Sequence, residues 1–211
     1  AIMNPPSLDP PPDDTYPGFA VRNKDRRTII FTGTNRGIME AIDARIGTEL
    51  WGLIPFNLLP KLRTLRDGQP VGSFDYFADG SPKISDVRLT DGTWHTYLIV
   101  GEGPGGTFYQ TIDVTLADMA TTGNVSPTDD TLATLLGYFS SPTRMPVKWS
   151  YPLYSNWEPN CAVLGATVCA NSPYGDLKAS ASLTEKTVGQ TWSDPAIGQI
   201  QASASPYVVL V

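Results

Sequence analysis

An internal repeat constrains the fold of this 211-residue chain more than any other feature of its sequence. Each copy has an apolar strand-like run, a second run that ends in an aspartate, and a closing run that contains a tryptophan. The copies comprise 30–33, Asp43 and Trp51 in the first unit, and 99–101, Asp113 and Trp149 in the second. Repeats of this length predict supersecondary units that bury their apolar faces by stacking on one another.

Short runs of apolar and β-branched residues between turn residues predict the strands of these units. The expected strands are 27–35, 38–43 and 49–55 in the first unit, and 81–89, 94–103, 107–115 and 146–153 in the second. A third copy begins near the end, where SDPAIGQI (193–200) corresponds to GSPKISDV (80–87) and PYVVLV (206–211) corresponds to YLIVG (97–101). The apolar spacing of 57–65 predicts a short helix, the only one expected in the first half.

The repeated strands predict an all-β fold, and four strands per unit with a tryptophan near the last is typical of a β-propeller blade. Nineteen glycines, nineteen prolines and only 17% charged residues agree with many short strands and turns. Propellers have about four to eight blades, so one complete and two partial units indicate part of a larger ring. The expected organisation is a Pro-rich extended arm or linker over 1–20, then a partial propeller over 21–211. Its blade remnants are about 27–55, 80–153 and 192–211, with long loop insertions at about 118–142 and 156–191.

Charge and cysteine content narrow the possible partners and compartments. A net charge of −6 and a pI near 4.7 disfavour nucleic acid, which requires clustered lysine and arginine. No apolar run of eighteen residues is present, so no transmembrane helix is expected. Cys161 and Cys169 lie in a Gly/Pro/Asn-rich region, and their spacing favours a loop-closing disulfide over a metal site. Export to an oxidising compartment is the better interpretation.

The acids and tryptophans that recur in the repeat are interpreted as structural residues. An aspartate at a strand end accepts hydrogen bonds from the amides of the following turn, as we expect for Asp43 and Asp113. Gly47 then supplies the positive φ of that turn. Trp51 and Trp149 are expected to pack between units rather than to stack on a ligand.

Other candidate motifs also have structural interpretations. GEGPGG (101–106) matches G-x-G-x-x-G, but a strand follows it where a dinucleotide site needs a helix, so a hairpin turn is predicted. His95 is the only histidine, and any Ser-His-Asp triad would depend on it; a strand position predicts a structural role. Asp79 and Gly80 are expected to form the turn into a strand. No EF-hand-like loop is present, and no catalytic, cofactor or metal residue is predicted.

Two segments carry a family resemblance. FTGTNRGIMEAIDARIGTELWGLIP (31–55) resembles the blade signature of quinoprotein dehydrogenase-like propellers. The segments that follow it, LIPFNLLPKLRTL, FDYFADGSPKISDV and GTWHTYLIVGEGPGGTFYQTIDVT, are similar to the C-terminal propeller domain of the PilY/PilC family of type IV pilus tip-associated adhesins and biogenesis factors. The resemblance extends from about residue 28 to 116, and it includes Asp79, Gly80 and Pro82. Asp75 departs from it, because the family often has histidine there, and GGTFYQTID replaces a more usual GGRGVYALD.

The PilY/PilC resemblance implies a non-enzymatic, pilus-associated propeller that acts in pilus assembly, surface adhesion or twitching motility. It implies pilin or minor pilins and a host or abiotic surface as partners, and a location at the pilus tip or outer membrane after export through the periplasm. Calcium binding is implied only for the full-length family protein, because the aspartate-rich loop that carries it is not in this sequence. Two alternatives are a quinone-dependent dehydrogenase, which needs a complete propeller with an acidic base and calcium ligands, and an outer-membrane assembly scaffold, which lacks the YFADGSP segment.

Overall fold

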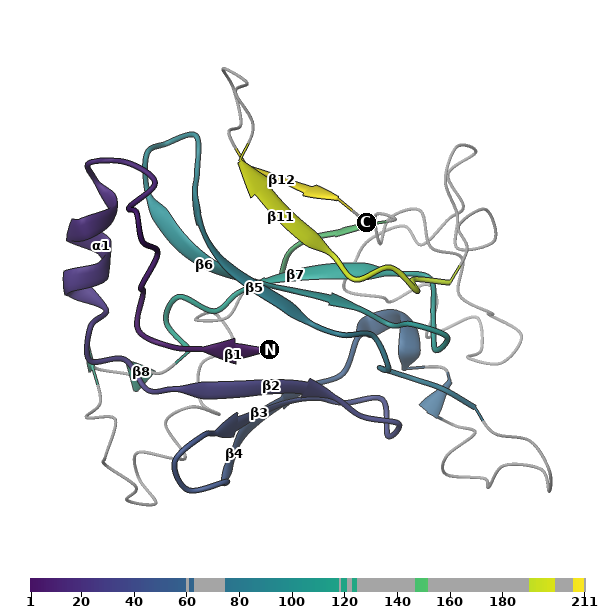
Figure 1. Cartoon of the computed structure of the whole chain (residues 1–211). Coiled ribbons are helices and arrows are strands. Elements are labelled where there is room, and N and C mark those ends of the chain that lie inside the picture. The colour runs from purple at the N-terminus through teal and green to yellow at the C-terminus, as the bar shows by residue number, and fades with distance from the viewer. Residues whose placement is uncertain are drawn as a thin grey trace.

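The computed structural model of the chain describes residues 1–59, 61–62, 75–117, 119–120, 123–124, 147–151, 190–199 and 207–210. These residues form two four-stranded sheets and two two-stranded hairpins, with every strand pair antiparallel. Figure 1 shows the first sheet, the second sheet and the C-terminal hairpin stacked as three successive layers. The all-β fold class is therefore confirmed. The described strands do not close into a ring.

The first sheet is a meander that runs from the N-terminal residues to Leu53. Its strands are β1 (Ile2–Met3), β2 (Ile29–Gly33), β3 (Met39–Asp43) and β4 (Glu49–Leu53), in the order β1-β2-β3-β4. Burial alternates along β2 and β3, as expected for strands with one covered face. Gly37 makes the turn between them with φ +79°, a conformation that glycine adopts without steric cost.

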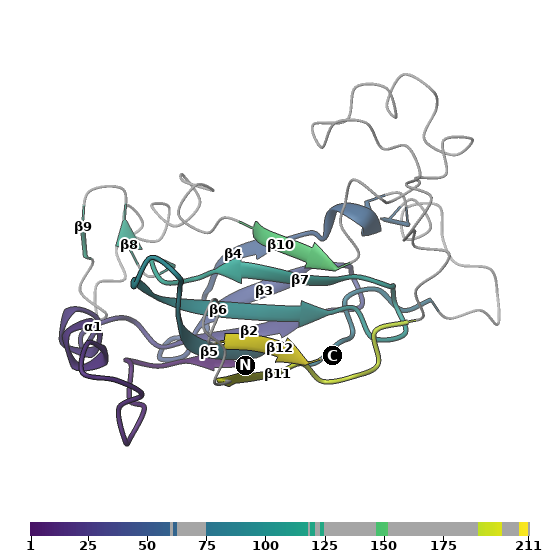
Figure 2. The ribbon, with the colours of Figure 1, turned by 90° about the horizontal axis from the view of Figure 1, so that it is seen from above.

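The second sheet is also a four-stranded meander, and it forms the middle layer. Its strands are β5 (Lys83–Arg88), β6 (Trp94–Gly101), β7 (Tyr109–Asp113) and β10 (Val147–Tyr151), in the order β10-β7-β6-β5. Figure 2 shows these four strands lying side by side above the first sheet. Every residue of β7 is buried, as a strand covered on both faces should be.

Two further hairpins complete the described structure. β8 (Met119–Ala120) pairs with β9 (Gly123–Asn124), and both fall in the insertion expected over 118–142. β11 (Ala196–Gln199) pairs with β12 (Tyr207–Leu210), and this C-terminal hairpin is the third layer. The other residues of the two expected insertions, apart from Gln190 and Thr191, lie outside the described residues.

Strand register shows that the two sheets are copies of one unit. Trp51 lies opposite Ala41, two residues before Asp43, and Trp149 lies opposite Thr111, two residues before Asp113. In both sheets the register shifts by one residue beside the tryptophan, so that Leu50 and Lys148 are the extra residues of the closing strands. β2, β3 and β4 therefore correspond to β6, β7 and β10.

The C-terminal hairpin corresponds to β5 and β6, with one correction to the sequence alignment. Ile197 pairs with Val209 as Ile84 pairs with Leu98. Val209 therefore takes the place of Leu98, whereas aligning PYVVLV with YLIVG by their tyrosines puts it at Ile99. Both alignments join apolar runs, but side chains alternate between faces, so a one-residue difference exchanges the two faces of the strand.

The main core lies between the first and second sheets. The first sheet contributes buried residues from β2, β3 and β4, and the second contributes alternate residues of β6 and β7 and the residues that follow β7. This core comprises Met3, Ile29, Phe31, Met39, Ala41, Leu50, Trp51, Leu98, Val100, Ile112, Val114 and Ala117. One face of the second sheet thus packs against the first sheet, and its other face is directed toward the C-terminal hairpin.

The structure differs from the extended arm expected over 1–20. β1 adds to the edge of the first sheet, and α1 (Tyr16–Arg22) packs Tyr16 and Phe19 against Trp94. The Tyr16 hydroxyl donates a hydrogen bond of 2.7 Å to Asp86, and burial raises the pKa of Tyr16 to about 12. A two-residue strand and a seven-residue helix containing Pro17 and Gly18 are too short to give a periodic sequence signal.

The helix expected over 57–65 is described only at its start, as the 3₁₀ helix η1 (Phe56–Leu58). Because α1 precedes it, the prediction of a single helix in the first half was wrong. No helix among the described residues has the length and hydropathy needed to cross a bilayer.

Candidate functional site

Asp43 fastens the turn between β3 and β4. One carboxylate oxygen accepts hydrogen bonds from the amides of Arg45 (2.8 Å) and Ile46 (3.0 Å), and the other pairs with the Arg27 guanidinium. The Gly47 amide donates to the Asp43 carbonyl at 2.9 Å, and Gly47 has φ +73°. The Asp43 and Arg27 side chains are only 0% and 2% exposed. The aspartate is thus fully used in holding its own turn and a buried cation.

The equivalent position in the second unit has the same construction with a different base. Asp113 accepts hydrogen bonds from the amide (3.1 Å) and hydroxyl (2.6 Å) of Thr115, and its second oxygen lies 2.7 Å from Nδ1 of His95. His95 lies two residues before Tyr97, the partner of Asp113, just as Arg27 lies two residues before Ile29, the partner of Asp43. His95 therefore replaces Arg27, and its side chain is 25% exposed.

Burial and pairing act in opposite directions on the Asp43 carboxyl. Burial alone raises its pKa, but the hydrogen bonds from Arg27, Arg45 and Ile46 and the positive charge of Arg27 outweigh this effect and lower the pKa below the ordinary value. Asp43 is therefore ionised at neutral pH. This buried carboxylate accepts three hydrogen bonds from its own turn and from Arg27, which indicates a structural role.

Thr93, His95 and Asp113 have the connectivity of a hydrolytic triad but not its proton arrangement. Nε2 of His95 lies 3.0 Å from the Thr93 hydroxyl, and Nδ1 lies 2.7 Å from Asp113. In a triad the hydroxyl donates its proton to the imidazole. Here the Thr93 hydroxyl donates to Asp91 at 2.6 Å, so its proton is held by a carboxylate. The arrangement joins the β5–β6 turn to β7 and does not prepare a nucleophile.

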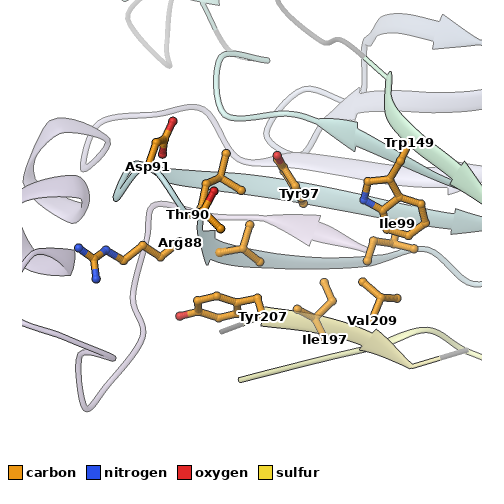
Figure 3. Close-up of a pocket in the computed structure, with 11 residues that line it drawn as sticks. Arg88, Thr90, Asp91, Tyr97, Ile99, Trp149, Ile197, Tyr207 and Val209 are labelled. Atoms are coloured by element: carbon orange, nitrogen blue, oxygen red, sulfur yellow. The ribbon is translucent and has the colours of Figure 1, made fainter. Parts of the chain in front are cut away.

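A groove of about 340 Å³ lies between the second sheet and the C-terminal hairpin (Figure 3). Aliphatic and aromatic side chains from both layers line most of it, and Arg88, Thr90 and Asp91 lie at one end. Its other lining residues are Val87, Leu89, Tyr97, Ile99, Trp149, Ile197, Tyr207 and Val209. A volume of this size falls within the range of ligand-binding pockets, about 300–1,000 Å³.

The groove occupies the face of the second sheet that corresponds to a covered face of the first. Ile29 and Phe31 correspond to Tyr97 and Ile99, and in the first unit both are buried against the second sheet. Trp51 is only 6% exposed, whereas Trp149 is half-buried at the side of the groove. The second sheet therefore covers Trp51, whereas the equivalent space over Trp149 is partly open.

The polar end of the groove is joined to the N-terminal segment. Arg88 lies 3.4 Å from Asp13, and Tyr207 packs edge-on against Trp94 with ring centroids 5.9 Å apart. Burial and nearby carboxylates raise the pKa of both Tyr97 and Tyr207, so their hydroxyls stay protonated at neutral pH. The groove thus offers apolar walls and neutral hydroxyls, with one guanidinium already paired.

The glycine-rich segment forms the predicted turn, and a strand follows it. Gly103 has φ +58°, and the Gly105 amide donates to the Glu102 carbonyl at 2.9 Å. A Cβ on Gly105 would lie 1.6 Å from the Phe77 carbonyl, so no larger residue fits there. The pattern at 101–106 therefore serves close packing of backbones rather than phosphate binding.

A buried carboxylate, which no sequence pattern had indicated, lies beneath this turn. Glu102 is fully buried and accepts hydrogen bonds from Asn57 (3.0 Å), Gln110 (3.1 Å) and the Phe108 amide (3.3 Å). Its own amide donates to the Thr191 hydroxyl at 2.7 Å. Glu102 thus joins the segment after the first sheet, the second sheet and the segment before the C-terminal hairpin.

The remaining predicted residues lie close to Glu102 or outside the described residues. The Asp79 amide donates to the Glu102 carbonyl at 3.2 Å, and a Cβ on Gly80 would lie 2.3 Å from the Gly101 carbonyl. Pro82 directly precedes β5. Cys161 and Cys169 lie outside the described residues, so their predicted disulfide stays a prediction.

The structure does not bring the predicted residues into one site. Asp43, Gly47 and Trp51 lie in the first sheet, and Asp113 and Trp149 lie at corresponding places in the second. Arg27 and His95 were not predicted as their partners, because they precede their aspartates by 16 and 18 residues and only the strand register shows that they are equivalent. No three or more His, Cys, Asp or Glu side chains within the described ranges are placed to hold a metal ion.

These features define a class: an all-β protein assembled from repeated, four-stranded antiparallel units, with a groove beside the third unit. Type IV pilus biogenesis factor PilY1 of Pseudomonas aeruginosa (strain UCBPP-PA14) is 32% identical over 108 residues, which is 51% of this chain and 9% of the relative. A PilY1 homolog of Xylella fastidiosa is 33% identical over 131 residues, 59% of this chain and 9% of the relative. The match thus spans about a tenth of each relative's length.

The chain is therefore similar in sequence to PilY1 proteins over about half of its length, and the predicted resemblance to the PilY/PilC family is confirmed. The crystal structure of the Pseudomonas aeruginosa PilY1 C-terminal domain aligns with 92% of this chain and 26% of that chain, with a TM-score of 0.49 and 19% identity. No protein-family model matches the chain.

Proposed function

We propose that this chain is part of an exported, non-enzymatic protein that acts in type IV pilus biogenesis. The observation that carries the proposal is the 32–33% identity with PilY1 biogenesis factors over about half of the chain. The matched proteins are named for that role, and the match covers only 9% of each. Because the match covers only a small part of these relatives, their role in pilus biogenesis is a proposal for the present chain.

The proposed architecture is a partial β-propeller. Its support is the shared register of the two sheets, in which an aspartate, a register shift and a tryptophan recur at the same places. The hairpin of β11 and β12 adds the first half of a third unit in the same arrangement. Stacked antiparallel units of this kind are how propeller blades bury their faces.

A scaffolding role is favoured over catalysis by how the polar residues are used. Asp43 and Asp113 accept hydrogen bonds from the turns that follow them and pair with Arg27 and His95. The Thr93 hydroxyl donates its proton to Asp91. The proposed partners are pilin or minor pilins and a host or abiotic surface, and the proposed location is the pilus tip or outer membrane. Adhesion and twitching motility are the finer roles proposed, and calcium is proposed only for the full-length family protein.

Deleting the two sheets from the natural protein tests the proposed role in pilus biogenesis. We expect an in-frame deletion of the two sheets to reduce the number of surface pili, counted by electron microscopy and by shearing followed by immunoblotting of pilin. A variant with Leu210→Lys, on an exposed position of β12, is the control. Unchanged pilus numbers, with the deleted protein still exported at a normal level, would contradict the proposal.

The proposed disulfide between Cys161 and Cys169 tests export independently. If the two thiols are bridged, intact mass after alkylation should show no added label without reductant and two labels after reduction. A bridge closing so short a loop is expected where the compartment is oxidising. Two alkylated thiols in protein purified from the cell exterior would show that the pair is free.

A further inference from the structure

Both ring nitrogens of His95 lie against oxygen atoms that have no proton to give them. Nδ1 lies 2.7 Å from the Asp113 carboxylate, which only accepts hydrogen bonds. Nε2 lies 3.0 Å from the Thr93 hydroxyl, and that hydroxyl donates its single proton to Asp91 at 2.6 Å. Both ring contacts are therefore hydrogen bonds only when each nitrogen carries a proton, which is the positively charged form of histidine.

Three charged groups face the His95 ring. Asp113 is the last residue of β7, and Asp91 lies in the turn between β5 and β6. Lys148 of β10 lies 3.7 Å from the same Asp113 oxygen that His95 contacts. Two carboxylates and one ammonium leave one negative charge unbalanced, and the doubly protonated ring supplies the positive charge that balances it.

The other groups around the ring are consistent with this assignment. Val87 is the register partner of His95 on β5 and is apolar. The ring of Tyr97 lies 6.0 Å away, and burial and nearby carboxylates raise the pKa of Tyr97, so it is neutral at neutral pH. Hydrogen bonds from the Thr93 hydroxyl and amide lower the pKa of Asp91, which is therefore ionised and accepts the hydroxyl proton.

The first unit has a permanent cation at the corresponding place. Arg27 pairs with Asp43, and both side chains are buried. His95 takes the equivalent position beside Asp113 and is 25% exposed, so it can exchange protons with water. A guanidinium stays charged throughout the physiological pH range, whereas an imidazole changes its charge between about pH 5 and 8. The exchange of arginine for histidine therefore makes this contact responsive to pH in the second unit only.

We propose that His95 is a pH-sensitive link between the β5–β6 turn and the end of β7. In mildly acidic solution the doubly protonated ring donates to Thr93 and Asp113 together. As the pH rises through the histidine range, one ring proton leaves to water. The ring then either faces an acceptor without a proton or accepts the Thr93 proton in place of Asp91, and either change breaks the chain of hydrogen bonds. This inference does not depend on the pilus role.

Release of the link has a defined structural consequence. The turn that it holds carries Thr90 and Asp91, which lie at the polar end of the groove (Figure 3). The Leu89 amide donates to the Thr93 carbonyl across this turn at 2.8 Å. Loss of the contact between Thr93 and His95 removes the side-chain attachment of the turn to β6 and β7. We therefore expect the turn to open more often at higher pH.

Amide hydrogen exchange of the whole 211-residue chain, followed by NMR between about pH 5.5 and 8, measures this opening. After correction for the intrinsic pH dependence of exchange, the Leu89 and Thr115 amides should become about three- to tenfold less protected as the pH rises, the usual effect of losing one hydrogen bond. The Arg45 and Ile46 amides, which donate to Asp43 in the first unit, are the internal control and should show no such step.

The ring itself gives a second, independent signal. His95 is the only histidine, so its nitrogen-15 resonances need no further assignment. At about pH 5.5 both ring N–H protons should be visible, because each is held in a hydrogen bond that slows its exchange with water. In a Thr93→Val variant the Nε2 proton should exchange rapidly, whereas the Nδ1 proton, which faces Asp113, should stay visible.

Two substitutions of His95 separate its charge from its presence. His95→Arg places a permanent cation there, as in the first unit, and should keep the Leu89 and Thr115 amides protected at every pH. His95→Gln places a neutral side chain there and should leave the same amides less protected at every pH. Both variants should therefore lose the pH-dependent step, but at opposite levels of protection.

The proposal is overturned if the wild-type chain shows no step at Leu89 and Thr115, or if the control amides of the first unit show the same step. It is also overturned if His95→Arg or His95→Gln retains the step, or if the Nε2 proton exchanges rapidly in the wild type. Should a variant fail to fold, the comparison of the two turns within the wild-type molecule decides. Pilus counts are a separate measurement, so either proposal can fail without the other.

Discussion

Replacing Asp43 with alanine is expected to lower the free energy of unfolding by about 3–5 kcal/mol, the usual effect of removing one member of a buried ion pair. The Arg27 guanidinium is 2% exposed, and in the variant it would have to be desolvated without the carboxylate opposite it. The amides of Arg45 and Ile46 would lose their acceptor as well. Urea unfolding followed by circular dichroism measures the change.

Asp113→Ala is the matched control for this prediction, because Asp113 occupies the same place in the second unit. Its partner His95 is 25% exposed, so water can replace the lost carboxylate, and we expect a loss of only about 1 kcal/mol. Equal losses for the two variants would contradict the view that burial of the base sets the cost.

The pH dependence provides a second control on the Asp43 prediction. Because the pKa of Asp43 is lowered in the folded protein, its carboxylate contributes stability above the ordinary aspartate pKa, and this contribution is lost as the pH falls through the lowered value. The difference in stability between the wild type and Asp43→Ala should therefore narrow at acidic pH. A constant difference would mean that the carboxylate charge is not what stabilises the turn.

The repeat in the sequence was sufficient to predict the strands but not what holds the layers together. All nine strands expected from apolar runs are present, from β2 to β12, because each is a short run between turn residues. β1 has two residues and gives no such signal; it is a strand only because the edge of β2 is available to it. The pattern of apolar residues thus predicted only those strands that are long enough to show it in their own sequence.

The residues that define the groove and the buried network could not be predicted in the same way. Glu102 lies within a glycine-rich turn, where an acid usually indicates a solvated loop, and it is buried only because Asn57 and Gln110 reach it from other segments. Tyr207 lines the groove because β11 and β12 pair in one register, and a shift of one residue would turn it away. The burial of Glu102 thus depends on a contact with a segment far away in the chain, and the orientation of Tyr207 depends on the pairing register of its hairpin.

Replacing Trp51 with alanine is expected to cost about 3–5 kcal/mol of unfolding free energy, as is usual for a large buried aromatic residue. Trp51 is 6% exposed within the core between the two sheets, and its ring packs against Phe31 with centroids 5.7 Å apart. Trp51→Phe should cost much less, since the indole N–H has no acceptor among the described residues and only packing volume is lost. Chemical denaturation of both variants measures these changes.

Trp149→Ala is the decisive comparison for Trp51→Ala, because the two tryptophans have the same register and differ in what covers them. Trp149 is half-buried at the groove, so its removal should cost about half as much or less, since the groove already exposes part of the ring to water. If Trp149→Ala costs as much as Trp51→Ala, Trp149 is already fully covered, and the groove beside it is not open to solvent.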